Sequence, residues 1–248
     1  MPLIEHLLEL RRRLMWAALG IIAGGIAGWF ISDWVLQLLT APLQQIGGRP
    51  AQINFPSVTG AFDVRFEIAI IVGIVIASPV WLYQIFAFLT PAFTRQEKKY
   101  VFGFFFSAVP LFLAGVAAGA FVIPHIVGLM VSFAPGGTAS LLDGKGYLDF
   151  ALRLLLVIGI AFVLPVFLVL LNFVGVLPGR TILKSWRIAI LAVTIFTAVA
   201  TPSADIISMI LLAIPMIVLY FVAVAIAIVH DKRKARRDAK LLADADTL

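Results

Sequence analysis

Residues 154–171 read LLLVIGIAFVLPVFLVLL, and no charged side chain interrupts them. A helix needs about 20 mainly apolar residues to cross the hydrocarbon core of a bilayer. With its flanks, residues 148–177, this run is long enough to span a membrane. The whole chain agrees, because 62% of its 248 residues are hydrophobic and 13% are charged, whereas about 25% of a soluble domain is charged. The sequence therefore predicts an integral membrane protein.

Other apolar runs lie on both sides of this segment. We predict six transmembrane helices, over residues 14–39, 64–88, 100–123, 148–177, 188–200 and 206–229. They would form a single all-α membrane domain over residues 1–248, with an amphipathic N-terminus at 1–13 and a basic tail at 230–248. The fifth and sixth helices are expected to be short, because the fifth run holds only 13 residues and a proline interrupts the sixth.

Prolines lie within four of the predicted helices: Pro79, Pro110, Pro165 and Pro215. Proline lacks a backbone donor and its ring clashes with the preceding turn, so it bends a helix. A bundle of bent helices leaves a concave face. We expect that face to receive ligand segments and partner helices.

Lysine and arginine residues are concentrated on one side of the predicted membrane. Fifteen of the 19 lie in the N-terminus, in the connections after the second and fourth helices, and in the tail. Because basic residues are enriched in cytoplasmic loops, this bias predicts that both termini are cytoplasmic. It also accounts for the net charge of +6 without a nucleic-acid partner.

Several kinds of catalytic site are excluded or disfavoured by the residues present. The chain has no cysteine, its three histidines are far apart, and it contains neither a GxxxxGK[ST] loop nor an HExxH motif. We therefore expect no enzyme activity, metal or cofactor. Two alternatives stay open: a small-solute transporter or channel, although its charges would be expected in the middle of the membrane, and an intramembrane hydrolase, although His125 has no evident serine partner.

The N-terminal stretch EHLLELRRRL, residues 5–14, places a carboxylate beside three arginines. Four leucines recur at helical spacing: Leu3, Leu7, Leu10 and Leu14. This stripe predicts a helix resting at the cytoplasmic membrane surface, with its arginines near anionic lipid headgroups. Glu9 precedes Arg13 by four residues, so the simplest prediction is an ion pair along the helix. Alternatively, Glu9 and Glu97, the one acidic residue in the connection before residue 100, together receive a cationic ligand, since guanidinium groups pair with carboxylates.

Three stretches of the chain resemble the TatC family, the receptor subunit of the twin-arginine protein translocase. They are HLLELRRRL at 6–14, GIVIASPVWLYQIFAFLTPAFTRQEKKY at 73–100 and TPSADIISMILLAIPM at 201–216. The resemblance implies a concave six-helix bundle in the bacterial inner membrane. It also implies that the protein binds signal peptides with paired arginines on folded precursors, and that it works with the subunits TatA and TatB in an oligomeric complex driven by the proton-motive force.

The resemblance also implies roles for particular residues. The positions that match signal-peptide binding are Glu9, Glu97, Arg11, Arg13 and Phe88. Pro42 and Asp205 match positions associated with family activity, although Asp205 could equally cap the sixth helix. Thr201, Met209 and Val163 match partner-docking positions.

Val163 marks a departure from the family, which commonly carries a glutamate at this point of the fourth helix. Its absence is expected to leave a hydrophobic patch. Asn172 could supply polarity and Glu67 could supply charge instead. For Glu67 we favour an ion pair at the membrane interface, beside Asp63 and Arg65.

Overall fold

The computed structural model describes residues 3–45, 53–54, 59–89, 98–132, 142–201 and 206–245. The helices in these ranges are α1 (Leu3–Gln45), α2 (Gly60–Ile76), α3 (Ser78–Leu89), α4 (Lys98–Ser132), α5 (Gly144–Phe173), α6 (Gly179–Lys184), α7 (Trp186–Ala200) and α8 (Ile206–Ala245). The strands β1 (Ile53–Asn54) and β2 (Leu142–Asp143) form one short parallel pair between two loops. The predicted all-α class is therefore confirmed, apart from this two-residue bridge.

Helix length and composition support four or five of the six predicted membrane spans. In the described ranges, four helices are long and apolar enough to cross a bilayer, and α2 with α3 makes a fifth if the bent pair counts as one span. The remaining apolar helix, α7, has 15 residues, so it is about 22 Å long and shorter than a hydrocarbon core of about 30 Å. The short fifth predicted helix is thus confirmed. The sixth is not short, because α8 runs for 40 residues and takes up most of the predicted tail.

Pro79 coincides with the sharpest bend that the structure records. Helices α2 and α3 meet at an angle of 55°, with Ala77 as the only residue between them. Proline has no N–H to continue the ladder of α2, and its fixed φ suits the first turn of a new helix. Four other prolines leave their helices unbroken: Pro110 and Pro124 in α4, Pro165 in α5 and Pro215 in α8.

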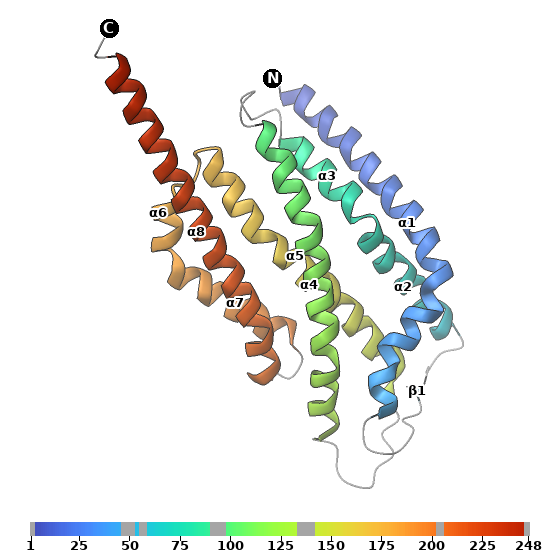
Figure 1. Ribbon diagram of the computed structural model, residues 1–248. Coiled ribbons are helices and arrows are strands. Elements are labelled where there is room, and N and C mark those ends of the chain that lie inside the picture. The colour runs from blue at the N-terminus through green and yellow to red at the C-terminus, as the bar shows by residue number, and fades with distance from the viewer. Residues whose placement is uncertain are drawn as a thin grey trace.

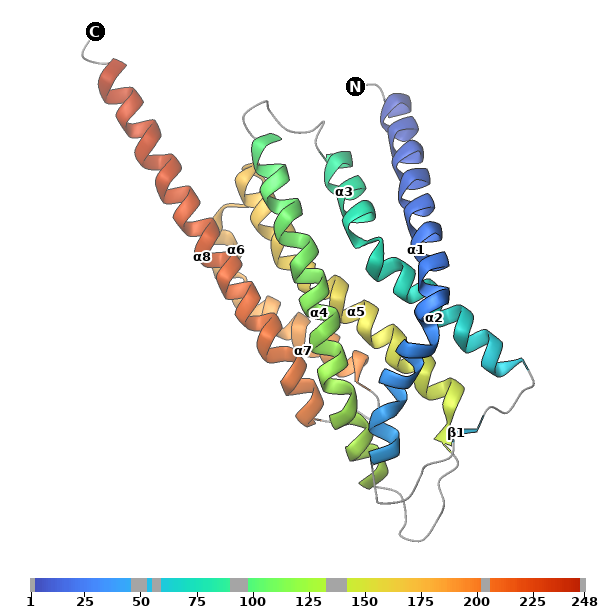
Figure 2. The ribbon, with the colours of Figure 1, turned by 45° about the vertical axis from the view of Figure 1, so that its right-hand side comes forward.

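The two termini lie at the same end of the molecule, which we call the terminal end (Figure 1). Helices α1 and α8 are well separated at this end in both views and diverge toward it in Figure 2, while α4 and α5 occupy the middle of the bundle. Strand β1 lies at the opposite end, which we call the strand end. A common side for both termini agrees with the charge pattern, and a concave face of the whole bundle stays a prediction.

Glycines allow the two most extensive helix pairs to pack closely. A Cβ placed on Gly24 of α1 would lie 2.5 Å from the carbonyl oxygen of Gly73 in α2, and one on Gly28 would lie 2.6 Å from that of Ala69. The pair α4 and α5 meets in the same way, since a Cβ placed on Gly115 would lie 2.9 Å from the Cα atom of Gly159. Since lipid tails are as apolar as leucine, membrane helices associate mainly through such close packing.

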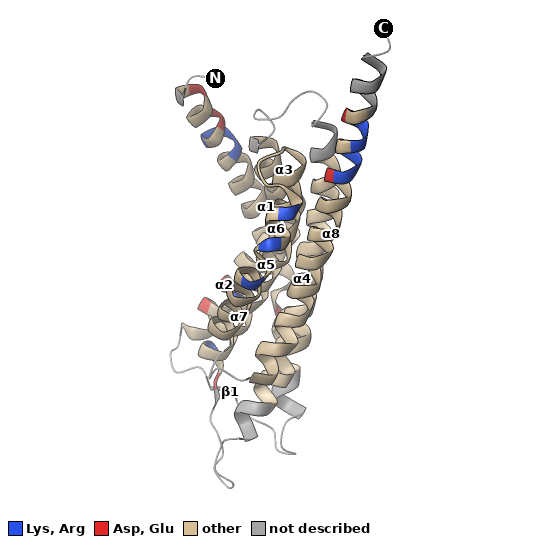
Figure 3. Ribbon diagram, turned by 90° about the vertical axis from the view of Figure 1, so that its left-hand side faces the viewer, with Lys and Arg blue, Asp and Glu red and all other residues tan. Residues whose placement is uncertain are grey.

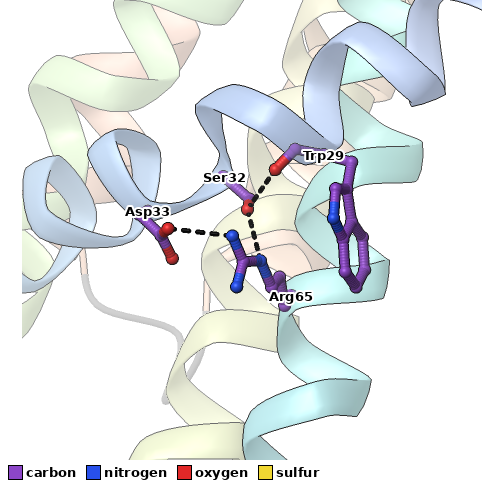
Figure 4. Close-up of polar contacts among 4 residues, drawn as sticks. All are labelled: Trp29, Ser32, Asp33 and Arg65. Carbon is purple, nitrogen blue, oxygen red and sulfur yellow. Dashed lines mark hydrogen bonds and ion pairs between the residues drawn. The ribbon is translucent and has the colours of Figure 1, made fainter.

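Polar groups tie α1 to α2 near the strand end (Figure 4). Arg65 donates to the Asp33 carboxylate at 2.9 Å and to the Ser32 hydroxyl at 3.0 Å, and its guanidinium lies 4.9 Å from the centre of the Trp29 ring. Ser32 in turn donates to the carbonyl of Trp29 at 2.7 Å. The ion pair predicted for Glu67 beside Asp63 and Arg65 is not among the ion pairs of the described residues, and Arg65 pairs instead with Asp33 of α1.

A second ion pair at this end joins α2 to α5. The ammonium group of Lys145 lies 3.0 Å from the Asp63 carboxylate, and Tyr147 donates from α5 to the carbonyl of Leu39 in α1 at 2.7 Å. Three helices are thus held together at the strand end by side chains that are distant in sequence. At the terminal end, by contrast, α1 and α8 stand apart.

The surface of the bundle is strongly apolar, as a bilayer requires. Large side chains such as Val199, Phe30 and Phe106 are 82%, 78% and 70% exposed. A soluble monomer rarely exposes so much contiguous apolar surface. These side chains are therefore positioned to contact lipid.

A carboxylate on α8 fastens the turn between α5 and α6. Asp231 accepts hydrogen bonds from the side-chain amide of Asn172 at 2.9 Å and from the backbone N–H of Gly179 at 2.7 Å. Gly179 has no room for a side chain, because a Cβ would lie 2.9 Å from the backbone of Ala227. The amide of Asn172 also donates to the carbonyl of Leu177. Asn172 therefore closes an internal turn, and its predicted role as a source of polarity for docking is not supported.

Asp231→Ala is expected to lower the free energy of unfolding by about 1–3 kcal/mol, because two hydrogen bonds to a charged group are lost and the Asn172 amide loses a partner. Chemical denaturation in detergent, followed by circular dichroism, measures the change. Asp238→Ala is the matched control, since it removes the same charge from an exposed position two turns further along α8. Equal stability of the two variants would contradict the fastening role of Asp231.

Candidate functional site

A pocket opens between α1 and α3 near the terminal end. It has a volume of about 320 Å³ and is lined by Glu9, Arg12, Arg13, Trp16 and Gln84. The four residues from α1 recur at spacings of three and four, which places them on one face of the helix. The sequence stripe of leucines lies on another face, with Leu7 and Leu14 63% and 67% exposed. One face of α1 is therefore available to lipid, and the other carries the polar pocket.

Glu9 forms the predicted ion pair with Arg13. The Nε and Nη2 atoms of Arg13 lie 3.0 Å and 2.6 Å from the same carboxylate oxygen, Oε1, and the two side chains are 23% and 25% exposed. The simplest prediction for Glu9 is thus confirmed. Within the described ranges no group donates to the other oxygen, Oε2. Because a carboxylate can accept several hydrogen bonds, the pair leaves Glu9 able to receive a second donor.

The electrostatic balance of the pocket decides what it can bind. Arg12 and Arg13 both line it, so the charge of Glu9 is more than offset by the protein itself. A cationic ligand would consequently gain little from Glu9 alone. A second carboxylate is needed nearby, and the sequence offers Glu97 in the connection between α3 and α4. Glu97 lies outside the described residues.

The C-terminal end of α3 supplies a further negative potential close to the pocket. Phe88, in its last turn, stacks on His6 of α1 with ring centres 4.4 Å apart. The end of α3 therefore lies against the first turns of α1. Carbonyl groups at a helix C-terminus carry about half a negative charge in total, which favours a cation there.

Sequence reasoning named Glu9, Arg13 and Phe88, and it missed Gln84 and His6 as parts of this region. Gln84 is the single amide in the apolar run SPVWLYQIFAFL of α3. That isolated polar residue could have predicted a place for Gln84 in the polar pocket, because an amide on a membrane helix needs a polar environment. His6 gave no comparable signal, since its contact depends on the packing of α1 against α3.

Other predicted site residues lie away from the pocket. Arg11 is exposed on α1 but does not line it. Thr201 is buried at the end of α7, where its hydroxyl donates to the carbonyl of Thr197. Met209 is partly buried on α8. The side chain of Pro42 and the whole of Asp205 lie outside the described residues, so their predicted roles stay predictions.

Val163 does not form the exposed hydrophobic patch that its sequence position suggested. It is 3% exposed and belongs to a core cluster with Leu82 and Phe86 of α3 and Phe112 of α4. Helices α3 and α4 cover the side chain, and the absent glutamate is therefore replaced by apolar packing. The predicted docking role of Val163 stays a prediction.

Comparison with known proteins identifies the family that this architecture matches. A family profile described as Sec-independent protein translocase protein (TatC) matches residues 5–215. The Sec-independent protein translocase protein TatC of Xylanimonas cellulosilytica is 41% identical over 242 residues, which cover 96% of this chain and 88% of that protein. The same protein of Rothia mucilaginosa is 40% identical over 250 residues, with coverage of 99% and 85%.

Solved structures agree with the sequence relatives. A crystal structure of the twin-arginine translocase receptor TatC in DDM superposes with a TM-score of 0.77 at 27% identity, over 90% of this chain and 99% of the other. A second crystal structure of that receptor gives a TM-score of 0.71 at 28% identity, with coverage of 90% and 97%. The helical arrangement described above is thus shared with these receptors over nearly the whole chain.

Proposed function

The chain belongs to the TatC family of Sec-independent protein translocase proteins, and we propose that it binds the twin-arginine signal peptides of folded precursor proteins through the pocket around Glu9. Membership makes it a membrane-embedded subunit of the twin-arginine translocase. Its relatives are named as translocase components, which fits a role without catalysis. The pocket adds a specific place where recognition can occur.

The charge distribution supports a cytoplasmic location for this pocket in a bacterial inner membrane. Basic residues colour the first turns of α1 and the C-terminal part of α8 in Figure 3, at the end where both termini lie, and further basic residues colour α6 nearer the middle of the molecule. Cytoplasmic segments of membrane proteins carry an excess of lysine and arginine. A precursor waiting for export would therefore meet the terminal end first.

The Glu9 carboxylate is the observation that carries the proposal. It is held in place by Arg13 through Oε1 and keeps Oε2 for an incoming donor. An arginine side chain presents several N–H groups in a fixed fork that suits carboxylate oxygens. Two consecutive arginines then need two acceptors, and Glu97 with the carbonyl end of α3 would provide the second. Arg13 acts as a positioning residue, because its two hydrogen bonds to Oε1 restrain the carboxylate and leave Oε2 open to a ligand.

Partner subunits would use a different part of the molecule. We infer that TatA and TatB dock in an oligomeric complex near Thr201 and Met209, at the strand-facing ends of α7 and α8, and that the proton-motive force drives transport. The family resemblance supports this assignment. The short α7 supports it as well, since a helix of about 22 Å leaves membrane depth that a partner helix could fill.

Glu9→Gln tests the proposal directly. The substitution keeps the shape and a hydrogen-bonding oxygen but removes the charge, so we expect about a tenfold weaker affinity for a twin-arginine peptide, in line with about 1.5–3 kcal/mol for a charged hydrogen bond. Affinity is measured by fluorescence anisotropy with purified protein in detergent. A peptide with two lysines in place of the arginines should bind the wild type weakly.

Glu5→Gln is the matched control, because Glu5 is exposed on α1 and does not line the pocket. It should leave the affinity unchanged. If Glu9→Gln bound the peptide as tightly as Glu5→Gln, the pocket around Glu9 would not be the recognition site.

A further inference from the structure

A second hollow, larger and of different chemistry, lies between α5, α6, α7 and α8. It has a volume of about 480 Å³, and its walls are almost wholly apolar, including Leu164, Leu168, Ala189, Ala192 and Met216. Leu164 and Ile188 of its lining are 54% and 70% exposed. The hollow is therefore a groove on the surface of the bundle, and its size is within the range of small-ligand sites, about 300–1,000 Å³.

Polar and basic residues lie at one end of this groove. Thr181 and Ser185, from α6 and the residue after it, lie in its lining, and Tyr220 of α8 contributes a third hydroxyl group, which donates to the carbonyl of Ile182. Arg180, Lys184 and Arg187 are sequence neighbours of Thr181 and Ser185 and are all exposed. Lysine and arginine are visible along α6 in Figure 3. Arg180 and Lys184 belong to the same six-residue helix as the lining residue Thr181, and Arg187 follows the lining residue Ser185 by two positions, so these cations lie beside the groove.

The three cations lack carboxylate partners within the described part of the chain. None of them appears in an ion pair there, and the sequence from 173 to 204 contains no aspartate or glutamate. Arg187 instead lies over the ring of Trp186, at 5.5 Å from the ring centre. Tryptophan is typical of the membrane interface. The cluster therefore presents uncompensated positive charge beside an apolar groove, next to a residue type that is common at the membrane interface.

We propose that this groove binds one anionic phospholipid of the cytoplasmic leaflet. An acyl chain would lie along Leu164, Leu168 and Ala192, and the phosphate would contact Arg180, Lys184 and Arg187. Basic pockets between membrane helices on the cytoplasmic side suit such headgroups, and the leaflet there is rich in anionic lipid. A partner helix could fill the apolar walls equally well, but the walls alone do not explain three unpaired cations at their edge.

Native mass spectrometry of the detergent-purified protein tests the assignment. The protein is titrated with phosphatidylglycerol and, separately, with phosphatidylcholine of the same acyl chains. We expect one phosphatidylglycerol to bind at least about fivefold more tightly than phosphatidylcholine, since each basic residue near an anionic headgroup contributes about that factor. Equal affinities for the two lipids would overturn the proposal, because the headgroup charge would then have no role.

The charge arm compares two triple variants. Arg180→Gln/Lys184→Gln/Arg187→Gln should reduce phosphatidylglycerol affinity by about tenfold or more and abolish the preference over phosphatidylcholine. The control, Arg233→Gln/Lys234→Gln/Arg237→Gln, removes the same charge from exposed positions on α8 and should keep the preference. If both variants lost phosphatidylglycerol affinity equally, the proposal of a specific site would be overturned, because the loss would then reflect only the net charge of the protein.

The groove arm uses Ala192→Phe, which fills the apolar channel. It should lower the occupancy of both lipids, whereas Ile195→Phe, on an exposed part of α7 outside the groove, should change neither. Unchanged lipid binding by Ala192→Phe would overturn the proposal. So would a photo-crosslinker at residue 192 that captures a single-helix protein and no lipid in native membranes. Wild-type affinity for the twin-arginine peptide shows that each variant is folded, independently of the lipid result.

Discussion

Gly24→Leu is expected to prevent stable packing of α1 against α2 and to reduce the folded protein in the membrane to a small fraction of the wild-type amount. A Cβ at this position would lie 2.5 Å from the carbonyl oxygen of Gly73 and 3.2 Å from its Cα. These are backbone atoms, so no side-chain rotation can relieve the contact. Overpacking a well-packed interior typically costs about 1–3 kcal/mol, and more where the backbone must move. The two helices would have to separate along the face where their glycines meet.

Gly103→Leu is the control for this experiment. Gly103 is also in a membrane helix, but a Cβ there would have no neighbour within 4 Å. The amounts of folded protein are compared after detergent extraction by fluorescence size-exclusion chromatography, and thermal stability is measured on the same samples. Similar profiles for Gly24→Leu and Gly103→Leu would show that α1 and α2 are not held by close backbone contact.

Combining Glu9→Gln with Glu97→Gln is expected to abolish export of a twin-arginine precursor, with a loss of more than about a hundredfold if each carboxylate contributes about 1.5–3 kcal/mol to binding. The expectation follows from the charge balance in the pocket. Arg12 and Arg13 already offset Glu9, so the removal of both carboxylates leaves a net repulsive site for a doubly cationic peptide. Export is measured as the periplasmic fraction of a reporter precursor in a strain without its own TatC.

The matched control for the double variant is Glu5→Gln combined with Asp238→Asn. It removes two negative charges from exposed positions on α1 and α8 near the terminal end. Export should continue at the wild-type level. Substantial export by the Glu9 and Glu97 double variant, at equal protein amounts in the membrane, would contradict the role of the carboxylates, whereas failure of both double variants would point to a general charge effect.

Much of the helical content follows from the order of residues alone. Long apolar runs such as 154–171 must be helical in a bilayer, because only a helix satisfies its own backbone within one segment. The ion pair of Glu9 with Arg13 was equally predictable, since residues four apart face each other on a helix. The bend between α2 and α3 was also predictable from Pro79, because proline has no backbone N–H to continue the hydrogen-bond ladder of a helix.

Contacts between distant segments were beyond this reasoning. The sequence suggested an ion pair for Glu67 beside Asp63 and Arg65, but the packing of α1 on α2 brings Asp33 to Arg65 instead. Val163 looked like an exposed patch from its place in an apolar helix, and only the positions of α3 and α4 bury it. Likewise, apolarity predicted a short sixth helix, whereas α8 continues through the charged tail to Ala245.

What the sequence determined by itself is the set of properties that act within a few residues or along a single helix: membrane insertion, helical structure, the bend at Pro79 and the asymmetry of positive charge. These depend on local hydrogen bonding and on transfer between water and lipid, which are nearly additive along the chain. What only the tertiary structure decided is which faces of the helices meet. That choice depends on close contact at glycines and on ion pairs between distant residues, and neither can be read from a periodicity, because lipid solvates the apolar faces of a helix almost equally well.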